Sequence, residues 1–305
     1  MAAGPAQIES LRRFILEEIY IAFGLPPGSW LRRALAPVFW LPTRRFARMA
    51  ADVDEQVARG GLREAASQVL PRFVRRYQFC GAERVPAQGP LVIAANHPGA
   101  ADSLGILASL PRDDLHVVVS GIPFLRGLPH AGRHFLYATP DPHQRMLVFR
   151  AMLRHLEGGG SLLLFARQDV EPDPALMPGA AEALERWSSS VALCMQHVPS
   201  ARLVVAITSG VLASGWLRSP IIRLREEAIP QQKLAEFLQV SQQMLLGGDF
   251  GLTPRLTYAG PWSLADLGAG GSSAAVMEAV IERAKGALQE HLSGMGCRGE
   301  EYGQV

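Results

Sequence analysis

A histidine and an aspartate five residues apart follow a short apolar run in this sequence. Residues 91–95 are Leu-Val-Ile-Ala-Ala, and His97 and Asp102 come after them. Such a run predicts a buried strand, and the crevices of open α/β sheets lie beyond the carboxyl ends of their strands. Asp102 would lie about one turn into the next helix and hold the imidazole in one tautomer. With a pKa near 6.5 the ring would be largely neutral and could act as a general base, which points to an enzyme.

The elements that position this pair follow from the pattern of the chain after residue 81. Apolar runs of strand length and composition lie at 91–95, 115–120, 135–138, 161–165 and 203–208. Helical patterns separate them at 101–110, 143–156 and 175–197. Strands that alternate with helices predict an α/β fold with a mostly parallel sheet flanked by helices.

The segments on either side of this core have helical patterns. Amphipathic helices are expected at 8–23 and 62–77, with a helix pair within 30–49, and further helices at 231–246 and 274–292. The 30–49 segment mixes tryptophans and aliphatic residues with arginines, which fits a membrane interface and equally a helix packed on its own domain. We predict three regions: a helical N-terminal region (1–80), an α/β core (81–229), and C-terminal helices with a frayed tail (230–305).

Composition limits the class of protein. A net charge of +2 over 305 residues gives no indication of nucleic acid as a partner. No apolar segment reaches the roughly 20 residues of a membrane span, and residues 1–10 lack a signal-peptide pattern, so a cytoplasmic protein is expected. Cys80, Cys194 and Cys297 are far apart, so we expect reduced thiols, with neither disulfide nor metal site.

The segment from Asn96 to Asp102 resembles the histidine, four residues, aspartate signature of the glycerolipid (lysophospholipid) acyltransferase superfamily, in which an asparagine often precedes the histidine. Residues 135–139 lie where that family has a second motif leading to an arginine for the acceptor's phosphate. Thr139 stands near that arginine's place, and Arg145 is the nearest basic residue downstream.

Two later segments extend the resemblance to roughly residues 80–225. Residues 159–165 resemble the approach to the third motif, Phe-Pro-Glu-Gly, of which Phe165 is kept, whereas Ala166, Arg167 and Gln168 replace the rest. Residues 203–210 are similar to the family's fourth, apolar motif. Phosphate recognition would then depend on a substitute arginine, and the candidates are Arg167, Arg145, Arg133 and Arg126.

The resemblance implies transfer of a fatty acyl group from acyl-CoA or an acyl-carrier protein to a hydroxyl of a lysophospholipid or glycerol phosphate. His97 would be the general base and Asp102 its orienting partner, and no permanently bound cofactor is expected. The chain would lie peripherally on the inner face of the cell membrane, held by its N-terminal helices. The residues implied in substrate binding are Asn96, Gly99, Arg145, Phe165 and Arg167.

The altered motifs leave alternatives open. The chain could be a lipid-binding homologue without catalysis, or a thioesterase or hydrolase that uses the same base on water. The carboxylates of Glu171 and Asp173, which alternate with prolines, either line the site or turn the chain, and the pattern favours the turn.

Overall fold

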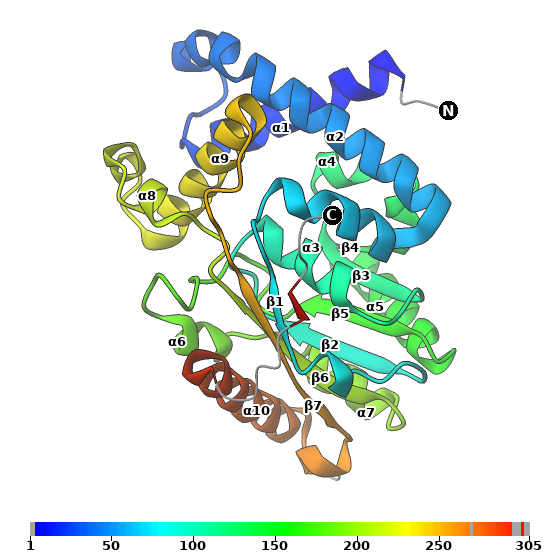
Figure 1. The fold of residues 1–305 in the computed structure, drawn as a ribbon. Helices are drawn as coiled ribbons and strands as arrows, with labels where there is room; N and C mark the ends of the chain where they lie inside the picture. The colour runs from blue at the N-terminus through cyan, green and yellow to red at the C-terminus, as the bar shows by residue number, and fades with distance from the viewer. Residues whose placement is uncertain (1–3, 269–270, 295–299, 302–305) are drawn as a thin grey trace.

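The computed structural model describes residues 4–268, 271–294 and 300–301, and a mixed sheet lies at its centre (Figure 1). Five parallel strands follow one another in the spatial order β4, β3, β5, β2, β6. Their bounds are Leu91–Ala95 for β2, Leu115–Ser120 for β3, Phe135–Ala138 for β4, Ser161–Phe165 for β5 and Arg202–Ser209 for β6. The prediction of a mostly parallel α/β sheet is therefore confirmed, with all five predicted strands within one residue of their observed ends.

The sheet continues past β6 with strands that the sequence analysis missed. The strand β7 (Arg255–Trp262) runs antiparallel to β6, and β1 (Gln78–Cys80) pairs in parallel with β7. The two-residue strand β8 (Glu300–Glu301) pairs with β1, so this part of the tail is not frayed as expected. The strand β1 is too short to give a pattern. The end of β7 contains Gly260-Pro261, which is typical of a turn rather than a strand.

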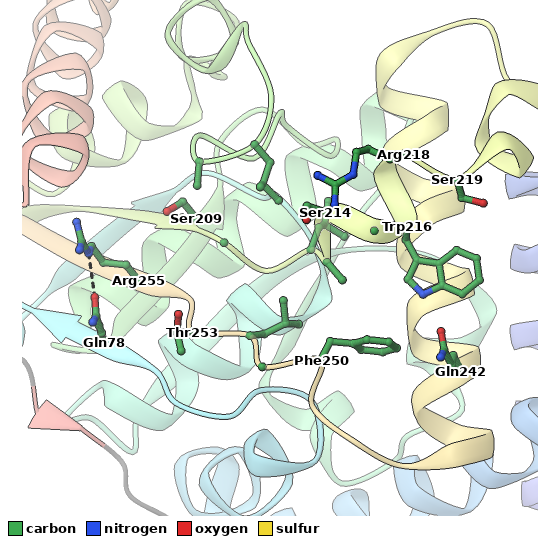
Figure 2. Close-up of a pocket in the computed structure, with 18 of the residues that line it drawn as sticks. Gln78, Ser209, Ser214, Trp216, Arg218, Ser219, Gln242, Phe250, Thr253 and Arg255 are labelled. Carbon is green, nitrogen blue, oxygen red and sulfur yellow. Dashed lines mark hydrogen bonds between the residues drawn. The ribbon is translucent and has the colours of Figure 1, made fainter.

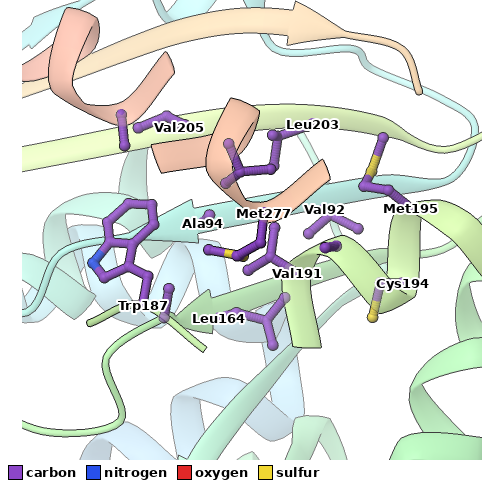
Figure 3. Close-up of a cluster of buried hydrophobic side chains, with 14 of the residues drawn as sticks. Val92, Ala94, Leu164, Trp187, Val191, Cys194, Met195, Leu203, Val205 and Met277 are labelled. Atoms are coloured by element: carbon purple, nitrogen blue, oxygen red, sulfur yellow. The ribbon is translucent and has the colours of Figure 1, made fainter. Parts of the chain in front are cut away.

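Helices cover both faces of the sheet. One face is covered by α5 (Pro142–Glu157), α6 (Ala180–Leu184), α7 (Ser190–His197) and α10 (Ser273–Ser293). Figure 3 shows part of this core, in which Val92 and Ala94 of β2 lie near Val191 of α7 and Met277 of α10. The strand β2 has apolar layers on both sides, and all five of its residues are buried. A strand in that position is held rigidly, and so is the residue that follows it.

The other face is covered by α2 (Trp30–Val69) and α3 (Ala100–Ser109). Beyond them, α1 (Pro5–Ala22), α4 (Pro123–Arg126) and α9 (Ala228–Leu246) pack with α2 in a separate apolar cluster. The short helix α8 (Ser214–Leu217) lies near α9 at the same end of the molecule (Figure 1). Within the described residues, no helix combines the length and the apolar character that crossing a membrane requires.

The helix α2 is one element where a helix pair and a separate helix were expected. Pro37 and Pro42 lie inside it, and the Thr43 hydroxyl donates to the carbonyl oxygen of Phe39 near the second proline. Within α2, Gly61 has non-helical dihedral angles (φ 80°, ψ 178°) and marks a kink. Glycine tolerates that conformation, so the chain continues helically on both sides.

Two further expectations were wrong. The predicted 175–197 helix is divided into α6 and α7, and it begins only after Pro178 and Gly179, whose φ is 95°. Cys80 is disulfide-bonded, whereas Cys194 is a buried free thiol. Distance along the sequence therefore did not exclude a disulfide at Cys80. Cys297 lies outside the described residues.

Candidate active site

Residues 96–99, which we call the His97 turn, connect the end of β2 to the start of α3. This turn begins between the carboxyl ends of β5 and β6. Asn96 continues the strand pairing through its side chain. Its amide nitrogen donates to the carbonyl oxygen of Thr208 (2.9 Å), and its amide oxygen accepts from the backbone N–H of Thr208 (2.7 Å). Asn96 is buried, with its amide group committed to β6. Its observed position therefore fixes the turn and does not present the side chain to an open surface.

The His97 and Asp102 side chains are in direct contact. The Nδ1 atom of His97 lies 2.9 Å from one carboxylate oxygen of Asp102 and 3.2 Å from the other. Asp102 is fully buried at the third position of α3, and it also accepts from the backbone N–H of Gly99 (3.1 Å) and the hydroxyl of Ser103 (3.0 Å). With Nδ1 committed to the carboxylate, Nε2 is the ring nitrogen left to exchange a proton.

The ring of His97 is held but not enclosed. Its side chain is 28% exposed, and the ring of Phe165, at the end of β5, packs against it with 4.4 Å between centroids. Phe165 thus contacts the predicted base. The backbone N–H of Gly99 donates to Asp102 (3.1 Å), so this amide is already hydrogen-bonded within the protein.

The surroundings shift the proton affinity of His97. Burial lowers its pKa, but the charge and the hydrogen bond of Asp102, with the charges of Glu236 and Glu171, outweigh burial and raise the pKa to about 9. The expected pKa near 6.5 was therefore wrong. At pH 7 about one ring in a hundred is neutral in the unliganded protein. The imidazole is a stronger base than expected, but a smaller fraction of it is in the neutral form that can accept a proton.

A loop and a helix from distant parts of the sequence fix the backbone of the turn. The backbone N–H of Glu171 donates to the carbonyl oxygen of His97 (2.8 Å). The side-chain amide of Gln232, on α9, donates to the carbonyl oxygens of Pro98 (2.7 Å) and Glu171 (2.8 Å). An ideal Cβ on Gly99 would lie 2.9 Å from a carboxylate oxygen of Glu236, so a larger residue at this position would displace that carboxylate.

Glu171 and Asp173, the two carboxylates expected to turn the chain, lie in different environments. Asp173 accepts from three backbone amides, those of Ala175, Gly210 and Val211, at 2.9–3.0 Å, and it therefore joins the loop to the end of β6. Glu171 is also buried, and it accepts from the indole N–H of Trp187 (3.1 Å). Burial raises the pKa of Glu171 to about 8 despite the opposing effects of Trp187, Arg167 and His97. Asp173 turns the chain, whereas Glu171 also acts electrostatically on the site.

The candidate arginines lie in different places. Arg167 lies two residues beyond the end of β5 and is half-buried, and its charge lowers the pKa of Glu171. Arg126 lies over the ring of Tyr137 at 4.4 Å from its centroid. Arg145 and Arg133 are exposed, and no contact of the described residues joins either of them to His97. The structure thus brings Arg167 near the pair and leaves Arg145 on the surface of α5.

Gln168 occupies the place of the motif glycine and keeps a conformation suited to glycine. Its φ is 66°, and its N–H donates to the carbonyl oxygen of Phe165 in a tight turn. Left-handed backbone costs a residue with a side chain about 1 kcal/mol or more. The turn after β5 therefore places a glutamine in a conformation that favours glycine. From the sequence, the special conformation of position 168 could be predicted only by comparison with a motif that has glycine there.

Comparisons with known proteins give similarities in structure but none in sequence. No family model matches the chain, and no curated protein does. Among solved structures, the chain is similar to the crystal structure of the 1-acyl-sn-glycerophosphate (LPA) acyltransferase PlsC from Thermotoga maritima. The two share 10% sequence identity and a TM-score of 0.45, over 96% of this chain and 99% of that one. At 10% identity and a TM-score of 0.45, this similarity says nothing about the function of the site.

Proposed function

We propose that the chain is an acyltransferase that moves a fatty acyl group from a thioester donor to a hydroxyl of a lysophospholipid or glycerol phosphate. The supporting observation is the contact of 2.9 Å between Nδ1 of His97 and buried Asp102, with the ring partly exposed beyond β2. The resemblance of residues 96–102 to the acyltransferase signature supplies the reaction class.

The residues present account for each proton. The acceptor's hydroxyl proton moves to Nε2 of His97 while the hydroxyl oxygen attacks the thioester carbonyl carbon. Asp102 stabilises the imidazolium that forms. The carbon–sulfur bond then breaks, and the imidazolium returns its proton to the departing thiolate. General base catalysis of this kind contributes about 10²–10⁴-fold, and no nucleophilic side chain takes part.

The decisive test is the purified chain with labelled acyl-CoA and a panel of lysolipids, read by product mass. His97→Ala should lower transfer about 10²–10⁴-fold with an unchanged circular dichroism spectrum. His143→Ala, an exposed histidine on α5, is the matched control. Transfer by His97→Ala at the wild-type rate would rule out the proposal. A parallel series with acyl-carrier protein identifies the donor.

A second candidate, thioester hydrolysis, is favoured by the partial exposure of the His97 ring, which leaves it open to water. Release of free thiol at the same rate with and without acceptor would support hydrolysis. Absence of thiol release, together with retained lipid binding, would indicate a lipid-binding homologue.

We also propose peripheral contact of the N-terminal helices with the inner face of the membrane. Trp30 (72% exposed) and Trp40 (45%) lie on α2, and the guanidinium of Arg44 stacks over the ring of Trp40 at 5.0 Å. Exposed aromatics beside arginines suit an anionic interface. Because disulfides are rare in the cytosol, the redox state of Cys80 in cells tests the cytoplasmic location.

Flotation with anionic vesicles tests the membrane contact. Replacing Trp30 and Trp40 together with serine should release the protein from the vesicles. Replacing Met146 and Leu147, two exposed apolar residues of α5, should leave flotation unchanged. The reverse pattern would place the lipid contact on α5.

A further inference from the structure

A large cavity lies close to the His97 turn but is not part of it. Its volume is about 1140 Å³, and His97 does not line it. The end of β6 and the segment after it form one side, and the start of β7, the loop before it and the end of α10 form another. In Figure 2, Arg255 and Gln78 lie at one end of the cavity, and Trp216, Phe250 and Gln242 lie at the other.

Among the described residues that line this cavity, the charged side chains are arginines. Arg218 and Arg255 line it, and no carboxylate is among the described residues that do. Arg255 donates to uncharged acceptors, the side-chain oxygen of Gln78 and the carbonyl oxygen of His291, both at 3.1 Å. Arg218 is exposed, and within the described part of the chain neither arginine forms an ion pair. Two guanidinium groups without a carboxylate partner among the described residues favour an anion, above all a phosphate.

The floor of the cavity is polar but uncharged. The hydroxyl of Ser209 lies 2.7 Å from Nε2 of His291, whose Nδ1 lies 2.8 Å from the hydroxyl of Thr257. Burial, assisted by the charge of Arg255, lowers the pKa of His291 to about 4, so the ring is neutral near pH 7. The positive charge of the cavity therefore comes from the arginines, and the floor offers neutral hydrogen-bonding groups.

The other end of the cavity is aromatic. Phe250 is 40% exposed and has φ 53°, a left-handed conformation that is rare for a bulky residue. Trp216 also lines this end. Aromatic side chains at a pocket edge favour a flat ring, against which they can stack. In Figure 2, Arg218 lies near Trp216, whereas Arg255 lies at the other end, so the arginines lie at both ends of the cavity. The occupant indicated is an aromatic group that carries phosphates at more than one position.

Residues 210–212 and α9 each contact the His97 turn and also line the cavity. Val211 lies 3.3 Å from an ideal Cβ on Gly99, beside His97, whereas Gly210 and Leu212 line the cavity. Along α9, Gln232 bonds to Pro98, and Gln242 lines the cavity. Ten helical residues correspond to about 15 Å. The extended pantetheine arm of coenzyme A is long enough to span that distance.

We propose that this cavity binds the phosphorylated nucleotide end of a coenzyme A thioester donor, whose acyl end reaches His97. This inference rests on the proposed acyl transfer. Arg218 and Arg255 bind the phosphates, and Trp216 and Phe250 contact the adenine. The chain would then use coenzyme A thioesters in preference to acyl-carrier protein, which lacks the adenosine phosphates.

Binding of unreactive fragments tests the cavity without relying on catalysis. Calorimetry would compare adenosine 3′,5′-bisphosphate, glycerol 3-phosphate and inorganic phosphate on the whole chain. Arg218→Gln should weaken binding of the bisphosphate about tenfold or more, since each lost charge-assisted hydrogen bond costs of that order. Arg223→Gln, an exposed arginine outside the cavity, should have no effect. Arg255→Gln is the second variant, with its melting temperature as a check on folding.

The outcomes separate this inference from the proposed function. Equal binding of the bisphosphate by wild type, Arg218→Gln and folded Arg255→Gln would overturn the cavity assignment while transfer through His97 stands. Tighter binding of glycerol 3-phosphate than of the bisphosphate would overturn it too, by assigning the cavity to the acceptor. Bisphosphate binding that is unchanged in His97→Ala but lost in Arg218→Gln supports the cavity, even if no acyl transfer is found.

Discussion

The pH dependence of acyl transfer follows from the environment of His97. Because its pKa is raised to about 9, the neutral base should become more abundant with rising pH, and kcat/KM should increase about tenfold per pH unit and level off near pH 9. The difference from the ordinary value of 6.5 corresponds to roughly 3 kcal/mol in favour of the protonated ring. An unperturbed histidine would level off more than two pH units lower.

Substitutions of the carboxylates around the His97 ring test this pH dependence. Asp102→Asn removes the main opposing influence to burial, so the inflection should fall to pH 6.5 or below, with a lower plateau because the ring is less well oriented. Glu171→Gln and Glu236→Gln should each lower the inflection by a smaller amount. The pH of the inflection is the readout, because a merely structural defect would lower the plateau without moving it.

Two measurements would check the value independently. Thiol release from acyl-CoA between pH 6 and 10.5 gives kcat/KM, and an NMR titration of the His97 ring gives the pKa without substrate. An inflection near 6.5 in the wild type, or one that Asp102→Asn leaves in place, would refute the electrostatic account.

Three other consequences concern single positions. Gln168→Gly should raise the free energy of unfolding by up to about 1 kcal/mol, measured by urea denaturation, because it relieves the left-handed backbone; a loss of stability would contradict this. Gly99→Ala should lower kcat/KM roughly tenfold or more, because its Cβ would displace the Glu236 carboxylate; unchanged kinetics would show that α9 yields. Folding raises the pKa of Glu171 from 4.5 to about 8, so the stability from its bound proton is present below pH 4.5 and is lost as pH rises to about 8. Glu171→Gln should flatten that part of the curve of melting temperature against pH, and a curve parallel to wild type would argue against it.

The central fold was predictable because each strand carries its own signal. The five parallel strands are mostly apolar, as is typical of strands covered on both faces, and their lengths follow from the polar or glycine residues at or beyond their ends. The strands β1 and β7 lack such a signal, because their places depend on partners rather than on their own residues. Gln78 pairs with Arg255, 177 residues away.

One part of the candidate site was predictable from the sequence, and another part was not. The His97–Asp102 contact was predictable because a strand end and the first turn of a helix bring residues five apart together. The hydrogen bonds of Glu171 and Gln232 to the turn were not, because only the folded chain brings residues 171 and 232 to it. The raised pKa of His97 depends on those same long-range neighbours and on burial.

The antiparallel strand β7 has a consequence for folding during synthesis. The five parallel strands lie between residues 91 and 209, so their hydrogen bonds can form before synthesis of the C-terminal part of the chain is complete. The strand β1 is translated before all of them, yet its partner β7 emerges more than 170 residues later. Its backbone groups must therefore wait unpaired for most of translation. The part of the sheet formed by β7, β1 and β8 is completed last, after the His97 turn can already have formed.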